Sequence, residues 1–117
     1  MPEPTEIRYD RIAKQLKITF DDGRHFELPA EFLRTQSPSA EVQGHSPAER
    51  KVVSGRRHVG IIGIEPVGNY AVRLIFDDLH DSGIFSWSYL HELGERQDGI
   101  WRAYLDELAE KGLSRDP

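Results

Sequence analysis

The chain has 117 residues, no cysteine and a net charge of −5 from 15 basic and 20 acidic side chains. The lack of cysteine excludes disulfides, cysteine nucleophiles and cysteine-ligated zinc or iron–sulfur centres within this chain, and the acidic balance argues against general nucleic-acid binding. The length suits one domain over residues 1–117; because no apolar run approaches the roughly 20 residues that span a bilayer and no export signal opens the chain, we expect a cytoplasmic protein without membrane association.

Two alternating runs near the N-terminus predict a β-hairpin. Residues 16–20 and 25–28 alternate between apolar and polar side chains, and Asp-Asp-Gly at 21–23 separates them. Glycine accepts the positive φ that such a turn requires. Ile7 and Tyr9 predict a strand before this hairpin, and Pro29 is placed to open a short helix after it.

The stretch 36–58 is rich in serine, proline, glycine and charge, and it has no apolar period. We expect a mobile loop here, since connections longer than about 15 residues inside a compact domain are usually functional or flexible. Its second half carries Arg50, Lys51, Arg56 and Arg57 against one acidic residue. These cations form either a solvated charge run or an edge that faces an anion or a protein partner. The loop has no aromatic side chain on which a nucleic-acid base could stack.

Residues 61–67 and 70–76 are apolar runs around Gly68-Asn69 and predict a second hairpin. Pro66 cannot donate to a strand ladder, so it indicates an edge strand or a bulge. The next run, LHDSGIFSWSYL at 79–90, is expected to end the last strand and to begin a helix with Ser86 as its N-cap. Apolar residues at helical spacing over 101–108 predict a C-terminal amphipathic helix that stops at Lys111-Gly112.

These elements predict an α+β domain. We expect a mostly antiparallel sheet of five to six strands, built around the two hairpins, with the C-terminal helical segment packed on one face. Large aromatic side chains are needed to fill the contact between a small sheet and a helix. The aromatic residues expected in this structural role are Phe85, Trp87, Tyr89, Trp101 and Tyr104.

The run at 79–90 also contains the residue types of a hydrolytic triad, since His80 and Asp81 precede Ser82 and Ser86. Residues that are neighbours in sequence do not face one another as a triad requires. The chain has no nucleophile elbow, no glycine-rich phosphate loop and no carboxylate pair at a recognisable acid–base spacing. We therefore expect no enzymatic activity and no cofactor.

Three segments and the long loop together resemble one family. They are LRTQSPSAEV at 33–42, GNYAVRLIFDDLHDSGIFSWSYLHEL at 68–93 and the W-x-x-Y-L pattern at 101–105. They are similar to the gamma-butyrobetaine hydroxylase N-terminal-like domain, which occurs in bacteria as a stand-alone domain of unknown function. The resemblance implies a small β-rich accessory or docking unit without the catalytic iron site. Related domains are attached to P-loop ATPases of the iron–sulfur carrier type.

The resemblance also implies a metal position. In the carnitine-synthesis hydroxylases, this domain holds a structural zinc through three cysteines that follow a Leu-Arg pair and through a later histidine. Counted from the pair at 33–34, the cysteine positions are here Ser37, Ser39 and Val42, whereas the histidine is present as His80. Serine hydroxyls stay protonated and valine cannot ligate, so we expect this site to be degenerate and to hold no zinc.

Two functions from different classes stay open. The first is a non-catalytic protein-interaction module that uses the basic loop and a sheet edge, with a link to iron–sulfur or redox metabolism implied by the resemblance. The second is a metal-binding protein in which His80 acts with His45 or His58 from the loop. The metal content of protein purified without a histidine tag distinguishes them.

Overall fold

The computed structural model of the chain describes residues 2–44 and 46–117. The strands are β1 (Pro4–Asp10), β2 (Gln15–Phe20), β3 (His25–Pro29), β4 (Ile61–Val67), β5 (Ala71–Phe76) and β6 (Gly83–Ser86). The helices are α1 (Ala30–Thr35), α2 (Ala40–Gln43), the 3₁₀ turn η1 (Pro47–Glu49), α3 (Trp87–Glu95) and α4 (Gln97–Glu110). No helix among the described residues is long and apolar enough to cross a membrane.

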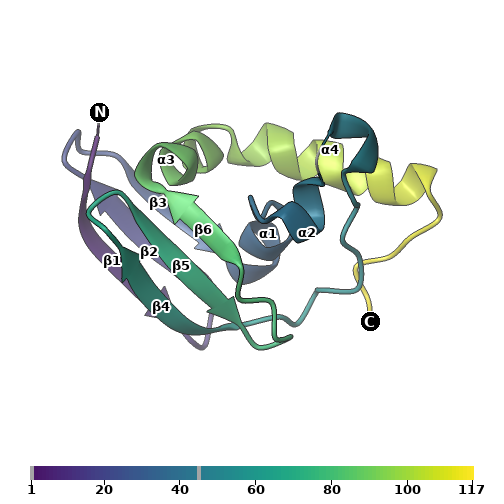
Figure 1. Ribbon diagram of the computed structural model, residues 1–117, viewed down its shortest axis with the longest axis horizontal. Coiled ribbons are helices and arrows are strands. Elements are labelled where there is room, and N and C mark those ends of the chain that lie inside the picture. The colour runs from purple at the N-terminus through teal and green to yellow at the C-terminus, as the bar shows by residue number, and fades with distance from the viewer. Residues whose placement is uncertain (1, 45) are drawn as a thin grey trace.

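The strands form two antiparallel sheets, ordered β1-β2-β3 and β4-β5-β6 (Figure 1). The expectation of one sheet of five to six strands is therefore wrong, whereas the α+β class and the two hairpins are confirmed. The side chain of Tyr9 links the two sheets through a hydrogen bond. The backbone N–H of Ile61, at the start of β4, donates to the Tyr9 hydroxyl of β1 at 3.1 Å.

Local turn chemistry forms the hairpins as predicted. In the β2–β3 turn, the N–H of Phe20 donates to the carbonyl of Arg24 at 2.8 Å, and Gly23 takes φ +87°. Pro66 lies in β4, which is an edge strand of its sheet, so its missing N–H breaks no central ladder. Ser86 caps α3 by accepting from the N–H of Tyr89 at 3.2 Å.

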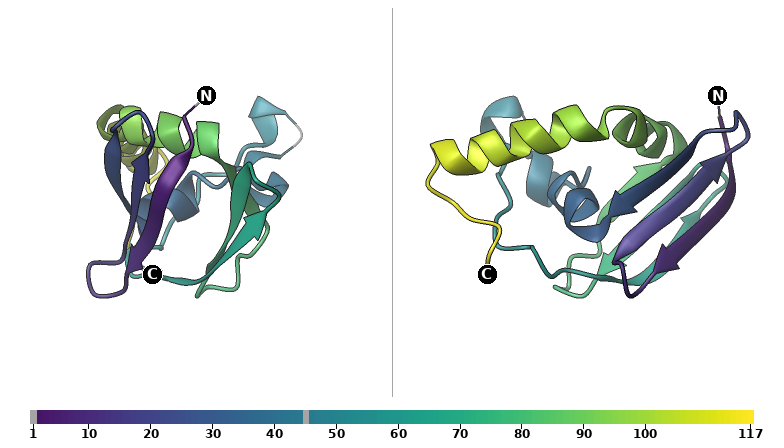
Figure 2. Two further views of the ribbon diagram at one scale, coloured as in Figure 1. Left: turned by 90° about the vertical axis from the view of Figure 1, so that its left-hand side faces the viewer. Right: turned by 180° about the vertical axis from the view of Figure 1, so that it is seen from behind.

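The core lies between the two sheets and is closed by α1 and α3 (Figure 2). Leu16 and Ile18 come from one sheet, Leu74 and Phe85 from the other, and each is fully buried. Helix α4 extends away from the sheets (Figures 1 and 2). Its first residue, Gln97, donates to the carbonyl of Glu27 in β3 at 3.3 Å, and its Trp101 ring meets Phe32 of α1 edge to face.

Close packing of α3 on β3 depends on a glycine. A Cβ at Gly94 would lie 2.3 Å from the ring of Phe26. Only a residue without a side chain leaves room for this ring under the helix. The glycine near the end of the first C-terminal helix is thus a packing requirement, and α3 continues to Glu95, one residue beyond it.

The stretch 36–58 contains α2 and η1 and contacts α4. The Tyr104 hydroxyl donates to the carbonyl of Val53 at 2.6 Å, and the N–H of Lys51 donates to the carbonyl of Val42 at 2.7 Å. The mobility expected of this stretch stays a prediction. His45 lies outside the described residues.

Candidate functional site

A tight turn after β5 points His80 into the protein. The N–H of Phe76 donates to the carbonyl of His80 at 3.0 Å, and the N–H of Leu79 donates to the carbonyl of Phe76 at 3.1 Å. Leu79 has φ +72°, in the left-handed region that few non-glycine residues occupy. Its side chain is 86% exposed, whereas His80 is 4% exposed. The turn therefore places an apolar side chain in solvent and buries the imidazole.

The turn after α1 brings the three positions implied by the family resemblance close to this imidazole. Ser37 is fully buried, and its Oγ lies 2.9 Å from Nε2 of His80. Ser39 caps α2 and contacts the Ser82 hydroxyl at 2.7 Å. Val42 is buried and borders the same cavity as His80. Residues 43 positions apart in sequence thus form one polar cluster.

Glycine makes room for this cluster at the start of β6. A Cβ at Gly83 would lie 2.7 Å from the Ser37 hydroxyl oxygen and 3.7 Å from Nε2 of His80. Any larger residue would therefore push Ser37 away from the imidazole. The small residue in the motif at 79–90 is required by this contact between β6 and the turn after α1.

The hydrogen-bond partners define the tautomer of His80. Nδ1 lies 3.2 Å from a carboxylate oxygen of Glu41, which accepts only, so Nδ1 carries the proton. Nε2 therefore accepts from the Ser37 hydroxyl, and the Ser37 oxygen in turn accepts from the N–H of Ser39 at 3.3 Å. Burial, and then the positive charge of Arg34, lower the pKa of His80 below its ordinary 6.5. The imidazole is neutral near pH 7.

The order Ser37–His80–Glu41 matches that of a serine–histidine–acid triad. A nucleophile must reach the substrate carbonyl, yet Ser37 has no exposed surface. The Ser37 oxygen also accepts a backbone hydrogen bond that supports the turn. In this arrangement the three side chains link the turn after α1 to β6 and do not present a nucleophile to solvent.

Asp78 is the acidic centre next to this cluster. Its Oδ2 accepts from Nε of Arg34 at 2.8 Å and from Nε of Arg56 at 2.7 Å, and its Oδ1 accepts from the N–H of His80 at 3.2 Å. Burial alone would raise the pKa of Asp78, but the hydrogen bond and charge of Arg34 lower it below 3.8 overall. One carboxylate therefore holds two arginines from distant parts of the chain.

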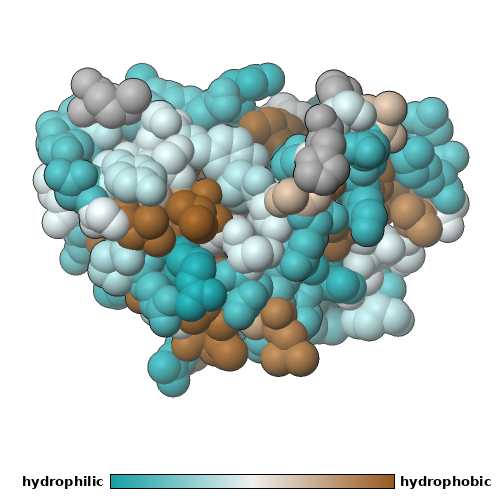
Figure 3. Space-filling model, in the orientation of Figure 1, coloured by the Kyte–Doolittle hydropathy of each residue, from teal (hydrophilic) through white to brown (hydrophobic). Residues whose placement is uncertain are grey.

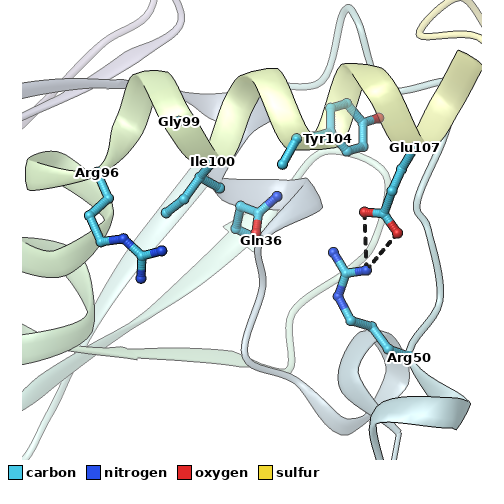
Figure 4. A pocket seen from close by; sticks show the side chains of 8 residues that line it. Gln36, Arg50, Arg96, Gly99, Ile100, Tyr104 and Glu107 are labelled. Carbon is cyan, nitrogen blue, oxygen red and sulfur yellow. Dashed lines mark hydrogen bonds and ion pairs between the residues drawn. The ribbon is translucent and has the colours of Figure 1, made fainter.

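Arg50, the first cation of the loop, borders a hollow of about 400 Å³ beside α4 (Figure 4). Its Nη1 donates to both carboxylate oxygens of Glu107, at 3.1 and 3.2 Å. Figure 4 shows Arg96 at the other end of the hollow, with Gln36 and Ile100 between the two arginines. Because Glu107 neutralises Arg50, this hollow has no unpaired cation at that end.

The remaining loop cations differ in their partners. Arg56 is paired with Asp78, and Arg57 is paired with Asp116 near the C-terminus. Lys51 is exposed and makes no ion pair within the part of the chain that the structure describes. The basic run is thus only partly a solvated edge, since its three arginines are each paired with a carboxylate and, among the described residues, only Lys51 is not.

The aromatic residues expected in the core occupy two environments. Phe85 and Tyr104 are buried, at 0% and 2% exposure. Trp87, Tyr89 and Trp101 are half-buried; each packs against the core. The indole N–H of Trp87 donates to the carbonyl of Asn69 at 2.8 Å, and the Tyr89 hydroxyl donates to that of Gln36 at 2.5 Å. All five contribute to packing, but three keep an exposed edge.

His58, the loop histidine that the structure describes, is not grouped with His80 in a metal-binding cluster. His58 is exposed, and its carbonyl accepts from Lys14 at 2.7 Å. Within residues 2–44 and 46–117, no three histidine, aspartate or glutamate side chains are grouped so that they could hold a metal ion. Metal binding by His80 with His45 or His58 stays a prediction.

Sequence reasoning missed Arg34, Glu41 and Asp78, which surround His80. Glu41 follows the capping serine of α2 at a position where acidic residues favour a helix start, which was an available signal. Arg34 and Asp78 are 44 residues apart, so nothing in their local sequence indicates the ion pair. Charged residues at such positions are most simply interpreted as surface groups.

Comparisons with known proteins agree with this architecture. The model of the family "Gamma-butyrobetaine hydroxylase-like, N-terminal" matches residues 7–91. A protein solved by NMR is 49% identical with a TM-score of 0.87, covering 100% of this chain and 92% of its own. A second NMR structure is 44% identical with a TM-score of 0.86, covering 100% of this chain and 87% of its own.

A crystal structure is also similar. It shows a protein with unknown function, of the DUF971 family, from Acidithiobacillus ferrooxidans ATCC 23270. The two chains are 36% identical with a TM-score of 0.65, and the match covers 79% of this chain and 92% of the other. No curated protein matches the chain. The family match extends over both hairpins, the serine turn and the His80 motif. The chain therefore belongs to the gamma-butyrobetaine hydroxylase-like, N-terminal family, a small α+β domain whose stand-alone relatives are of unknown function.

Proposed function

We propose that the protein is a non-catalytic interaction module that binds a protein partner through the outer face of the β4-β5-β6 sheet. This face is opposite the core, and no helix covers it in Figures 1 and 2. Extended apolar surface that a monomer leaves uncovered is a common feature of interaction sites. The proposal rests on the composition of this face.

Exposed isoleucines lie on this face and at its β4 edge, together with an ion-paired polar group. Ile84 of β6 is 46% exposed and pairs in register with Arg73 of β5, so both side chains share one face. Ile62 in β4 is 65% exposed. In Figure 3, hydrophobic spheres interrupt the hydrophilic surface over this sheet. Arg73, on the central strand β5, pairs with Glu65 of β4, so an ion pair lies beside Ile84 on this face.

The edge of β4 adds a second contact surface. β4 is an outer strand of its sheet, and a hollow of about 270 Å³ lies beside it, bordered by Arg11 and by Ile62 and Ile64 of this strand. An edge strand has backbone groups that a partner strand can pair with. Buried Ser37 supports the absence of catalysis, and the family resemblance supports a partner from iron–sulfur or redox metabolism.

The experiment compares charge substitutions on and off this face. Ile62→Lys and Ile84→Lys each replace an exposed isoleucine of the sheet, and Leu113→Lys replaces a leucine of similar exposure, 41%, after α4. Cross-linking in the native host, followed by quantitative identification of captured proteins, should show one partner reduced about tenfold or more by the sheet variants, the effect of losing about 1.4 kcal/mol. Equal capture by all three variants, each shown to be folded by circular dichroism, would refute the proposal.

A further inference from the structure

A cavity of about 520 Å³ lies next to His80, and its walls differ in chemistry. Arg34, Arg56 and Lys51 supply cationic groups, and Val42, Val52 and Val53 supply an aliphatic wall. A volume of this size is within the range of about 300–1,000 Å³ typical of small-molecule sites. The sequence contributes to it from four places: α1, α2, the segment 51–56 and the β5–β6 connection with His80.

Arg34 carries the strongest indication of a ligand. Its side chain is 9% exposed, and its Nε is used by Asp78. Its Nη1 is buried and finds no acceptor among the described residues. A buried charged donor without an acceptor costs about 1–3 kcal/mol or more, so native proteins usually supply a partner. Arg34 also borders the cavity, so an anion bound there would lie next to a guanidinium group that keeps an unused donor.

The charges around the cavity favour an anion. Arg34 and Arg56 both donate through Nε to the same oxygen of Asp78, so one carboxylate offsets two guanidinium groups. Lys51 adds a cation that has no ion pair within the described residues, and Glu41 adds an acid that accepts from His80. Three positive and two negative groups leave a local excess of one positive charge in a chain whose net charge is −5.

We infer that this cavity binds a small organic anion, whose carboxylate or phosphate head accepts from Arg34, Arg56 and Lys51 and whose short apolar body contacts the three valines. Guanidinium groups match the oxygens of carboxylates and phosphates in geometry as well as charge. The aliphatic wall contributes only to a ligand that carries hydrocarbon next to its charged head. The site differs from the outer face of the β4-β5-β6 sheet and is independent of partner binding there.

The test is an NMR titration of the full chain at constant ionic strength with sodium acetate, sodium butyrate, butyl phosphate and butylammonium chloride. We expect saturable amide shifts at residues 51–56 with butyrate or butyl phosphate, several-fold weaker binding of acetate, and no response to butylammonium. Tighter binding of butyl phosphate than of butyrate would assign a phosphate head; the reverse order would assign a carboxylate.

Variants separate this site from general charge effects. Lys51→Glu reverses an exposed cation at the cavity, and Lys111→Glu makes the same change at the exposed end of α4. We expect Lys51→Glu to weaken butyrate or butyl phosphate binding by about tenfold, the effect of about 1.4 kcal/mol, and Lys111→Glu to leave it unchanged. Shifts that never saturate, an equal response to butylammonium, or equal weakening in both variants would overturn the inference.

Discussion

Replacing Ser37 with alanine tests whether the polar cluster stabilises the fold. The substitution removes the hydroxyl that donates to Nε2 of His80 at 2.9 Å and that accepts from the N–H of Ser39 at 3.3 Å. Ser37 is fully buried, so water cannot readily replace either contact. A buried polar group left without its partner costs about 1–3 kcal/mol. We expect Ser37→Ala to lower the free energy of unfolding by that amount, mostly through the unpaired Nε2.

Urea denaturation at pH 7.5, followed by circular dichroism, measures this change. Ser88→Ala is the matched control because Ser88 is exposed on α3, and its unfolding free energy should change by less than about 0.5 kcal/mol. In a His80→Leu background, Ser37→Ala should cost less by at least about 0.5 kcal/mol, since the two side chains share one hydrogen bond. A cost below about 0.5 kcal/mol for Ser37→Ala, or full additivity with His80→Leu, would refute the reasoning.

Three further outcomes are expected. Because the pKa of His80 is lowered from 6.5 in the folded state, its contribution to stability is complete above pH 6.5 and declines as pH falls below that value. His80→Gln should therefore reduce the pH dependence of the urea midpoint between pH 7.5 and 5.5. The same pH dependence in the variant and the unsubstituted protein would contradict this. Elemental analysis of the natural protein should find well under one equivalent of zinc, whereas Ser37→Cys, Ser39→Cys and Val42→Cys combined should bind one equivalent only when His80 is present. Amide exchange should be faster across 36–58 than in β5, and equal protection would refute the predicted mobility.

The hydrogen bonds around His80 give this histidine a structural role in the fold. A neutral imidazole can donate through one nitrogen and accept through the other, and here Glu41 and Ser37 use both. Hydrogen bonds thereby link the turn after α1 to the β5–β6 connection.

Local features of the sequence were sufficient for several elements, although α2 and η1 within 36–58 were not predicted. Asp-Asp-Gly at 21–23 predicted the β2–β3 turn because only glycine takes its positive φ without strain. Ser86 was recognisable as an N-cap because its hydroxyl satisfies a free N–H of the first helical turn. The stop of α4 before Gly112, which has φ +65°, follows from the same rule. Each of these depends on contacts within a few residues.

Tertiary structure alone decided how these elements meet. Whether β1 and β4 share a ladder depends on the path of some thirty residues between β3 and β4. In the structure the two strands lie in separate sheets, and the Tyr9 hydroxyl accepts from the N–H of Ile61. The surroundings of His80 likewise come from α1, α2 and the segment before β4, none of which shows a local pattern for the contact. The sequence by itself determined the family, the hairpins and the Ser86 cap, because these depend on short-range geometry and residue type. The division into two sheets, the pairing of Arg34 and Arg56 on Asp78 and the cavity beside them depend on long-range packing, which no local period encodes.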